Sequence, residues 1–173
     1  MIIFIVGYMG SGKSTFGKRL ARYMGYDYID LDLLFEETYR IGIADFFSKY
    51  GEPIFRKMEH ELLEKTLNQE QVVISCGGGT PCFFNNMKLM NANGVTIYLH
   101  LEPAALAMRL ANARRKRPLI ETLPGDDLEQ KIKLHLAMRE HFYLQSKLVV
   151  DGISIELQKT VEKIRQLISE SGV

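Results

Sequence analysis

The sequence has little cysteine and no excess of charge of one sign. Its 173 residues include two cysteines, and 22 basic side chains against 21 acidic ones give a formal net charge of +1. Cys76 and Cys82 cannot form a disulfide framework and are not spaced as a CxxC motif, so we expect a reduced, cytoplasmic protein. The balanced charge argues against partners such as nucleic acid or anionic membranes, whose binding proteins have strongly basic surfaces.

Long hydrophobic runs, repeats and linkers are also missing from the sequence. No apolar run approaches the ~20 residues of a membrane span, and the start, MIIFIVGYMG, has neither a basic leader nor a cleavage site, so we expect no signal peptide. The composition, 46% hydrophobic and 25% charged, is that of a globular protein. We expect a single domain over residues 1–173 and, without an exposed apolar seam, a monomer.

Short apolar runs alternate with longer amphipathic stretches along the chain. Strands are expected at residues 2–6, 26–30, 72–75, 95–101 and 148–150. Helices are expected at residues 13–24, 32–39, 44–50, 53–67, 83–90, 104–111, 128–145 and about 157–168. This alternation predicts an α/β fold, a three-layer sandwich in which helices cover both faces of a parallel sheet.

A glycine-rich loop follows the first expected strand and precedes the first expected helix. The segment GYMGSGKST, from Gly7 to Thr15, matches the pattern GxxxxGK[ST] in the context that confirms it. The glycines allow a tight turn whose N–H groups, together with the helix N-terminus, form an anion site. Lys13 adds a positive charge for the β- and γ-phosphates, and Ser14 offers a hydroxyl to Mg²⁺. The alternative, a turn without a ligand, does not require this full pattern.

The glycine-rich motif, known as a P-loop, occurs in kinases, GTPases and motor ATPases, and two missing motifs argue against the last two classes. A GTPase would have an NKxD motif, and the chain contains no Asn-Lys pair. A motor or remodelling ATPase would have a carboxylate at the end of a Walker-B strand, whereas the expected strand 72–75 is followed by Cys76 and three glycines. Other carboxylates must therefore act near the metal and the nucleophile.

Asp30 and Asp32 are the candidate carboxylates. They lie two residues apart at an expected strand end, so both side chains can point to the same side. One would order water on the metal ion, and the other would accept a hydrogen bond from a substrate hydroxyl and help to remove its proton. N-capping of the next helix by Asp32 is the alternative.

Arg139 is a candidate anion-binding residue. Leu128, Ile132, His135, Arg139 and Phe142 form one stripe of the helix expected at 128–145, with Arg139 in its middle. A guanidinium on an inward face is costly unless an anion meets it. A buried salt bridge to a protein carboxylate and a two-pronged bond to a substrate carboxylate both satisfy this requirement.

Further candidates lie in the middle of the chain. Arg56 and Glu59 are three residues apart on an expected helix, where the alternative is a solvated ion pair of small value. Phe47 and Phe55 flank them and could be ordinary core. Gly77–Gly79 would let backbone approach a ligand closely, or could simply be a flexible turn.

A basic segment runs from Arg109 to Pro118 without an acidic residue. Its basic members are Arg109, Arg114, Arg115, Lys116 and Arg117. The near-neutral charge of the whole chain argues against a nucleic-acid patch. We expect a lid at about residues 112–125 that folds over bound ATP, excludes water and neutralises charge on the transferring phosphoryl group.

Taken together, these motifs resemble the shikimate kinase family. GYMGSGKST, DLD at 30–32, FRKME at 55–59, GGG at 77–79, RPLI at 117–120, and Arg139 followed by Tyr143 occur in the family's order and at similar spacings over nearly the whole chain. The resemblance implies a P-loop NTPase of the nucleoside monophosphate kinase type, with a five-stranded parallel sheet, a substrate-binding segment at about 32–62 and a mobile lid. It also implies transfer of the γ-phosphoryl group of ATP to the 3-hydroxyl of shikimate, a step toward chorismate and the aromatic amino acids, with Mg²⁺ as cofactor.

The resemblance implies a role for each candidate residue, with Lys13, Asp32 and Arg117 as the catalytic ones. ATP would be bound by Gly10, Ser11, Gly12, Lys13, Ser14, Thr15, Arg109 beside the adenine and Arg117 in the lid. Mg²⁺ would be held by Ser14 and, through water, by Asp30, with Glu59 steadying that acid. Shikimate would be bound by Asp32, the carboxylate clamps Arg56 and Arg139, the backbone of Gly77, Gly78 and Gly79, and the walls Phe47 and Phe55.

The chain departs from the family pattern at two places. Lys147 stands where the family's R-x-x-x-Y-x-x-x-A has a small residue, and residues 151–156 give no clear match to the adenine loop. Two alternative functions stay open on the sequence. One is another small P-loop metabolite kinase, such as a gluconate kinase. The other is a non-catalytic nucleotide-binding module, although such a module would be expected to have lost Lys13, Asp32 or Arg139.

Overall fold

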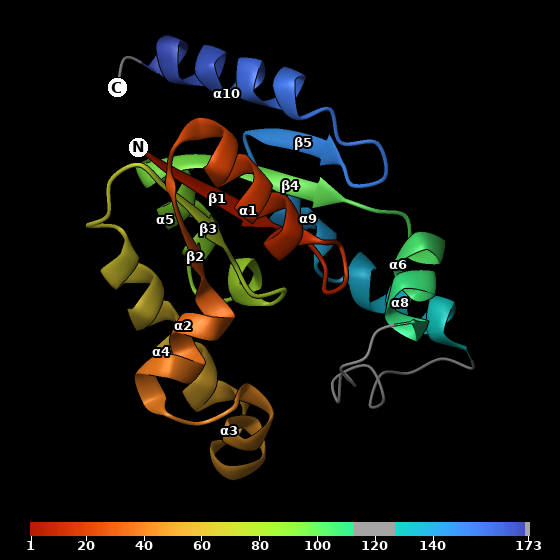
Figure 1. Ribbon diagram of the computed structural model, residues 1–173. Coiled ribbons are helices and arrows are strands. Elements are labelled where there is room, and N and C mark those ends of the chain that lie inside the picture. Colours follow the sequence, from red (N-terminus) through yellow and green to blue (C-terminus); the bar gives the residue numbers. More distant parts are fainter. Residues whose placement is uncertain (113–126, 172–173) are drawn as a thin grey trace.

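The computed structural model describes residues 1–112 and 127–171 (Figure 1). Five parallel strands form one sheet in the order β2-β3-β1-β4-β5. They are β1 (Ile2–Val6), β2 (Asp27–Asp30), β3 (Val72–Ser75), β4 (Gly94–His100) and β5 (Leu148–Asp151). The predicted five-stranded parallel sheet is therefore confirmed.

Helices cover both faces of this sheet (Figure 1). They are α1 (Lys13–Met24), α2 (Leu31–Tyr39), α3 (Ile43–Tyr50), α4 (Glu52–Thr66), α5 (Asn86–Asn93), α6 (Pro103–Ala111), α8 (Leu128–Ala137), α9 (Glu140–Tyr143) and α10 (Leu157–Ser171), with a 3₁₀ turn at Thr80–Cys82. Among the described residues, no helix combines the length and apolar composition needed to cross a membrane.

The central strand β1 divides the core into two layers. Its five side chains are all buried, and alternate ones point to opposite faces. Ile2, Phe4 and Val6 join a cluster with side chains of α2, α4, α5, α6 and α8, whereas Ile3 and Ile5 join one with side chains of α1 and α10. The predicted three-layer sandwich is confirmed.

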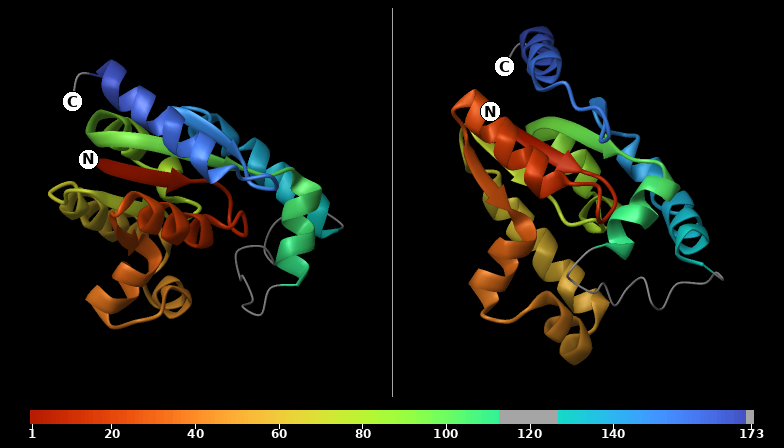
Figure 2. Two further views of the ribbon diagram at one scale, coloured as in Figure 1. Left: turned by 45° about the horizontal axis from the view of Figure 1, so that its top comes forward. Right: turned by 45° about the vertical axis from the view of Figure 1, so that its right-hand side comes forward.

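Helices α2 and α3 and the N-terminal part of α4 form a group that projects away from the sheet, apart from α6 and α8 (Figure 2). This group contains most of the segment at 32–62 that was assigned to substrate binding, and that role stays a prediction. The predicted lid lies outside the described residues apart from Asn112, and so does Arg117.

The helix expected at 83–90 is wrong over its first three residues. The chain makes a 3₁₀ turn over Thr80–Cys82, and α5 begins at Asn86. Between them Phe84 has a φ of 51°, which no α-helix allows, and its ring stacks on His60 with ring centroids 4.9 Å apart. The side-chain amide of Asn86 donates to the carbonyl oxygen of Thr80 at 2.8 Å, which ties the turn to the start of α5.

The single helix expected at 128–145 is also wrong. Helix α8 ends at Ala137 and α9 begins at Glu140, so Arg139 lies at the break rather than in the middle of a helix. The Arg139 N–H donates to the carbonyl oxygen of Leu136 at 2.8 Å, which tightens the last turn. Beyond the break Tyr143 is fully buried against Tyr98, so tertiary packing has overridden a continuous helical pattern.

Candidate functional site

The glycine-rich segment Gly7–Thr15, called the phosphate loop from here on, follows β1 and leads into α1, as predicted. Gly12 lies directly before α1 with a φ of 97°, a left-handed conformation that favours glycine. Gly7 has no space for a side chain, because a Cβ there would lie 2.7 Å from the carbonyl oxygen of Leu99. The Lys13 ammonium group donates to the carbonyl oxygens of Gly7 at 3.0 Å and Tyr8 at 2.9 Å, so its charge is held over the loop.

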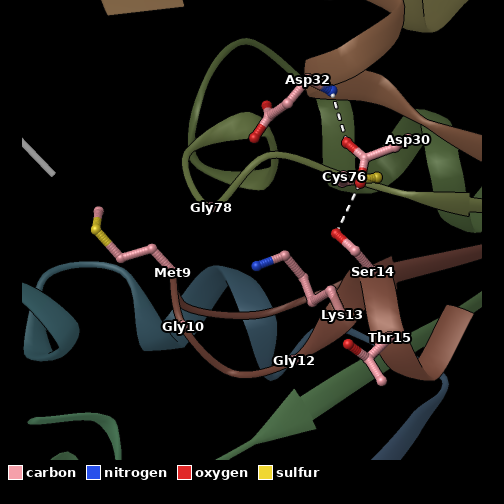
Figure 3. Close-up of a pocket in the computed structure, with 10 residues that line it drawn as sticks. All are labelled: Met9, Gly10, Gly12, Lys13, Ser14, Thr15, Asp30, Asp32, Cys76 and Gly78. Atoms are coloured by element: carbon pink, nitrogen blue, oxygen red, sulfur yellow. Dashed lines mark hydrogen bonds between the residues drawn. The ribbon is translucent and has the colours of Figure 1, made fainter. Parts of the chain in front are cut away.

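A cavity of about 250 Å³ lies between the phosphate loop and the ends of β2 and β3 (Figure 3). It is lined by Met9, Gly10, Gly12, Lys13, Ser14, Thr15, Asp30, Asp32, Cys76 and Gly78. The structure therefore brings most of the predicted phosphate-binding residues together with both predicted carboxylates. Ser11 is buried and does not line the cavity; its hydroxyl has no hydrogen-bond partner within the part of the chain that the structure describes.

Asp30 joins the phosphate loop to α2. Its carboxylate accepts hydrogen bonds from the Ser14 hydroxyl at 2.7 Å and from the N–H group of Asp32 at 3.2 Å (Figure 3). It also accepts one from the N–H group of Leu33 at 3.4 Å. The N-cap of α2 is therefore Asp30, and the alternative that Asp32 caps this helix is wrong. Asp32 lies in the first turn, where its carboxylate lines the cavity opposite Lys13.

The oxygen atoms of Ser14 and Asp30 suit a hard cation. Mg²⁺ prefers oxygen ligands and usually binds through one or two carboxylates, waters and substrate phosphates. A hydroxyl and a carboxylate 2.7 Å apart at the edge of the cavity fit that pattern. The described residues contain no group of three or more His, Cys, Asp and Glu side chains that could hold a metal by themselves.

Arg56 is buried between two acidic side chains. Its Nε and Nη2 atoms donate to one oxygen of Glu52 at 3.0 and 2.9 Å, and its Nη1 atom donates to Glu59 at 2.9 Å. The side chains of Arg56 and Glu59 are 5% and 2% exposed. The alternative of a solvated surface pair is therefore wrong, because these charges are held out of water.

The guanidinium of Arg56 also rests on aromatic rings and on glycine backbone. Its Cζ atom lies 4.4 Å from the centre of the Phe83 ring, 5.0 Å from that of Phe55 and 5.7 Å from that of Phe47. A Cβ on Gly79 would lie 2.6 Å from Cζ, so any side chain there would push Arg56 away. The predicted walls Phe47 and Phe55 thus contact the predicted clamp, although they do not line the cavity itself.

Asp32, Glu59 and Thr80 converge on Gly77. A Cβ on Gly77 would lie 2.7 Å from Oδ1 of Asp32, 2.9 Å from Oε1 of Glu59 and 3.0 Å from the Thr80 hydroxyl. That hydroxyl donates to Glu59 at 2.6 Å. Burial raises the pKa of Glu59, and the nearby positive charge of Arg56 opposes that shift. Glu59 therefore adjoins Asp32 and Arg56 here, and no hydrogen bond links it to Asp30.

Arg139 is half-buried and has no carboxylate of a described residue within ion-pair distance. The alternative of a buried salt bridge to a described acid is therefore not what the structure has. Its neighbour is Tyr143, whose hydroxyl donates to the carbonyl oxygen of Gly78 at 2.6 Å. Burial raises the pKa of Tyr143 well above its usual value, and the positive charge of Arg139 opposes the shift. Arg139 is thus close to Tyr143, which bonds to a residue of the cavity wall.

The sequence as a whole matches one protein family. The family model described as shikimate kinase matches residues 9–169, which is nearly the whole chain. The chain belongs to the shikimate kinase family. A curated shikimate kinase from Parabacteroides distasonis is 39% identical over 162 residues, which cover 94% of each chain.

Solved shikimate kinases have the same fold. A crystal structure of shikimate kinase from Bacteroides thetaiotaomicron is 36% identical, covers 98% of both chains and superposes with a TM-score of 0.86. The shikimate kinase from Acinetobacter baumannii, solved in complex with shikimate, is 27% identical, covers 98% of this chain and 93% of that one, and has a TM-score of 0.83.

Arg109, which the resemblance to shikimate kinases placed beside adenine, bridges two loops. Its Nη1 atom donates to the carbonyl oxygen of Ser11 at 2.8 Å, and its Nη2 atom donates to that of Gly152 at 3.0 Å. Gly152 belongs to the segment 151–156 that gave no clear family match from sequence. Arg109 does not line the cavity, and contact with adenine stays a prediction.

Sequence reasoning missed three residues of this shikimate kinase site: Glu52, Thr80 and Tyr143. Glu52 precedes Arg56 by four residues on α4, and that spacing is a signal for an ion pair that could have identified it. Thr80 and Tyr143 have no such signal, because their partners lie 21 and 65 residues away in the sequence. Tyr143 was noted as part of a motif, but no role followed from that position.

Proposed function

We propose that this protein is a shikimate kinase that transfers the γ-phosphoryl group of ATP to the 3-hydroxyl of shikimate in aromatic amino acid biosynthesis. Its products are shikimate 3-phosphate and ADP. The observation that carries the proposal is the cavity in which Lys13 of the phosphate loop faces Asp32 (Figure 3). Membership of the shikimate kinase family and the relative solved with shikimate support it.

The donor side would bind ATP through the loop from Gly10 to Thr15. Backbone N–H groups at the start of α1 favour a polyphosphate. Lys13 would exchange its present bonds to backbone carbonyls for the phosphoryl oxygens and stabilise the charge that develops on them. Arg117 would close from the lid.

Ser14 and Asp30 would hold Mg²⁺, Ser14 through its hydroxyl and Asp30 through water. When bound, the ion neutralises charge on the phosphates of ATP. The support for these two residues is the 2.7 Å contact between a hydroxyl and a carboxylate oxygen, both at the cavity edge.

On the acceptor side, Asp32 would accept a hydrogen bond from the attacking hydroxyl and help to remove its proton. Arg56 and Arg139 would bind the carboxylate of shikimate. Arg56 still has N–H groups beyond the three contacts to Glu52 and Glu59, because a guanidinium carries five donors. Gly77 and Gly79 would let the backbone of the glycine loop, Gly77–Gly79, come close to the shikimate ring, because neither has a side chain. Phe47 and Phe55 would hold Arg56 in place through the contacts of their rings with its guanidinium.

An acceptor assay tests this function. Purified protein with ATP and Mg²⁺ is given shikimate, gluconate or no acceptor; ADP release is followed by a coupled assay, and the product is identified by mass spectrometry. We expect ADP release with shikimate and a product heavier by one phosphoryl group. Turnover with gluconate instead would indicate the alternative metabolite kinase, and no turnover with either would favour a non-catalytic nucleotide-binding module.

A variant that lacks the phosphate-loop charge provides the control. Lys13→Met should abolish turnover while leaving the fold intact, as measured by circular dichroism. Activity retained by this variant would contradict the role of Lys13. The cytoplasmic location, the monomeric state and the absence of nucleic-acid partners stay predictions from the sequence.

A further inference from the structure

A buried tyrosine and a buried histidine join the phosphate loop to the helix that precedes Arg139. The Tyr8 hydroxyl lies 2.8 Å from Nδ1 of His135, and the two rings meet edge to face with centroids 5.5 Å apart. Tyr8 is 1% exposed and His135 is 6% exposed. Because they are 127 positions apart in the sequence, this contact exists through the fold alone.

The pair keeps its hydrogen bond over the neutral pH range. Burial lowers the pKa of His135 to about 4 and raises that of Tyr8 to about 12. His135 is therefore a neutral imidazole and Tyr8 a neutral phenol. A hydroxyl and a neutral imidazole can each act as donor or acceptor, so the bond is satisfied whichever ring nitrogen carries the proton.

Tyr8 has a second link, to the catalytic lysine. Its carbonyl oxygen accepts from the Lys13 ammonium group at 2.9 Å. His135 lies in the last turn of α8, four residues before Arg139, and the helix ends between them at Ala137. A single residue of the phosphate loop is thus bonded through its backbone to Lys13 and through its side chain to the helix that leads to Arg139.

We infer that the Tyr8–His135 hydrogen bond is a positioning contact that fixes Arg139 relative to the phosphate loop. It sets where the carboxylate of the acceptor is held with respect to the phosphoryl donor. The inference rests on the proposed function, because it takes Arg139 as the clamp for shikimate. Neither Tyr8 nor His135 is placed against the reacting atoms.

The hydroxyl of Tyr8, rather than its ring, makes the hydrogen bond to His135. A phenylalanine at position 8 would fill the same space and keep the edge-to-face contact with His135. The phosphate loop has its own supports, such as the bond from the Ser11 N–H to the Tyr8 carbonyl at 3.2 Å and those from Lys13. The backbone bonds at the α8–α9 break, from the Arg139 N–H to the carbonyl oxygen of Leu136 at 2.8 Å and from the Phe142 N–H to that of Arg139 at 2.9 Å, are local to the break and do not join it to the phosphate loop. Loss of the Tyr8 hydroxyl should therefore displace Arg139 relative to the loop.

The test compares Tyr8→Phe, His135→Leu, the double variant and His135→Asn, whose amide can replace the imidazole nitrogen as partner. The matched control is Thr160→Val, which removes a buried hydroxyl of α10 that bonds to Glu156. For each protein, the KM values for shikimate and ATP, kcat, and the Kd for shikimate by calorimetry without nucleotide are measured. Thermal unfolding is followed in parallel.

We expect Tyr8→Phe and His135→Leu each to raise the Kd and KM for shikimate about tenfold, because a buried partner is left unsatisfied. The KM for ATP should stay within about twofold, since the loop keeps its backbone bonds. The Kd for shikimate of the double variant should not exceed that of the weaker-binding single variant, because the effects of substitutions at two residues in contact are not additive. His135→Asn should recover most of the affinity, and Thr160→Val should bind shikimate like the wild type.

Two results would overturn the inference while leaving the proposed function intact. One is a wild-type affinity for shikimate in Tyr8→Phe. The other is an equal rise in the KM values for ATP and shikimate, which would mark a purely structural effect on the phosphate loop. If the wild-type protein itself neither binds nor phosphorylates shikimate, the proposed function fails, and the inference fails with it.

Discussion

The hydroxyl of Tyr143 donates a 2.6 Å hydrogen bond to the carbonyl oxygen of Gly78. Tyr143 is fully buried on α9, directly after the break that carries Arg139, while Gly78 lines the cavity. This bond holds the glycine loop, Gly77–Gly79, against α9, which begins next to Arg139, the proposed carboxylate clamp. Two parts of the proposed acceptor site that are far apart in the sequence are therefore held together by one hydroxyl.

Removal of that hydroxyl should weaken acceptor binding. Tyr143→Phe keeps the ring against Tyr98 but leaves the Gly78 carbonyl without its partner. We expect the KM for shikimate to rise about tenfold, which corresponds to the roughly 1–3 kcal/mol cost of an unsatisfied buried group. The KM for ATP should change little. Steady-state kinetics with each substrate varied in turn will check this, and an unchanged KM for shikimate would show that the bond does not position the site.

The backbone under Arg56 should tolerate no side chain. Gly79→Ala would put a Cβ 2.6 Å from the Cζ atom of Arg56 and displace the guanidinium. We expect loss of shikimate binding with nucleotide binding retained, both measured by calorimetry. Gly42→Ala is the matched control, because the nearest atom to a Cβ there is 3.5 Å away. Normal shikimate binding by Gly79→Ala would contradict the proposal that Arg56 binds the carboxylate of shikimate.

The buried pair of Arg56 and Glu59 should matter for stability as well as binding. Glu59→Ala leaves a buried guanidinium with its remaining bonds to Glu52, which is 39% exposed. We expect the free energy of unfolding to fall by about 3–5 kcal/mol, measured by urea denaturation. The double variant Arg56→Met, Glu59→Leu should recover part of that loss, because it removes both charges. A loss below about 1 kcal/mol in Glu59→Ala would instead fit a solvated pair.

Acid should destabilise the protein through His135. Its pKa is lowered from 6.5 to about 4 by burial and by the positive charge of Arg139, against an opposing effect of Glu52. The unfolded chain therefore binds a proton below pH 6.5 that the folded protein takes up only near pH 4. The stabilisation from the neutral side chain is complete above pH 6.5 and is lost as the pH falls toward 4, by on the order of 3 kcal/mol.

The same variant used for the hydrogen bond isolates this effect. His135→Asn keeps a partner for Tyr8 but cannot titrate. Urea denaturation of both proteins at a series of pH values should show a steeper loss of stability for the wild type between pH 6.5 and 4. Parallel curves would mean that the pKa of His135 is the same in the folded and unfolded states.

The fold could be predicted because its signals are local. The apolar run Ile2–Val6, the phosphate loop and the stops at Gly25 and Pro103 each act within a few residues. The errors occur where distant contacts decide. Phe84 leaves the helical region to stack on His60, and the chain breaks at Arg139 so that Tyr143 can pack in the core.

The candidate site also has a part that local sequence signals predict and a part that distant contacts decide. The phosphate loop and the Asp30–Asp32 pair are each a short continuous segment next to an expected strand, so their places at the ends of the strands could be predicted from the sequence. The shell around Arg56 comes from α4, the glycine loop and Phe83, and that around Arg139 comes from α8, α9 and the phosphate loop. Sequence spacing carries no signal for contacts between separate elements, and this is why Thr80 and the Tyr8–His135 pair could not be predicted.

The central claim is that guanidinium groups grip the acceptor's carboxylate beside the phosphate loop, and Arg139→Ala tests it most directly. Steady-state kinetics should show the KM for shikimate rising by far more than that for ATP, because loss of a charged hydrogen bond to a buried carboxylate costs roughly 2–5 kcal/mol. Unchanged turnover and an unchanged KM for shikimate in this variant would contradict the account.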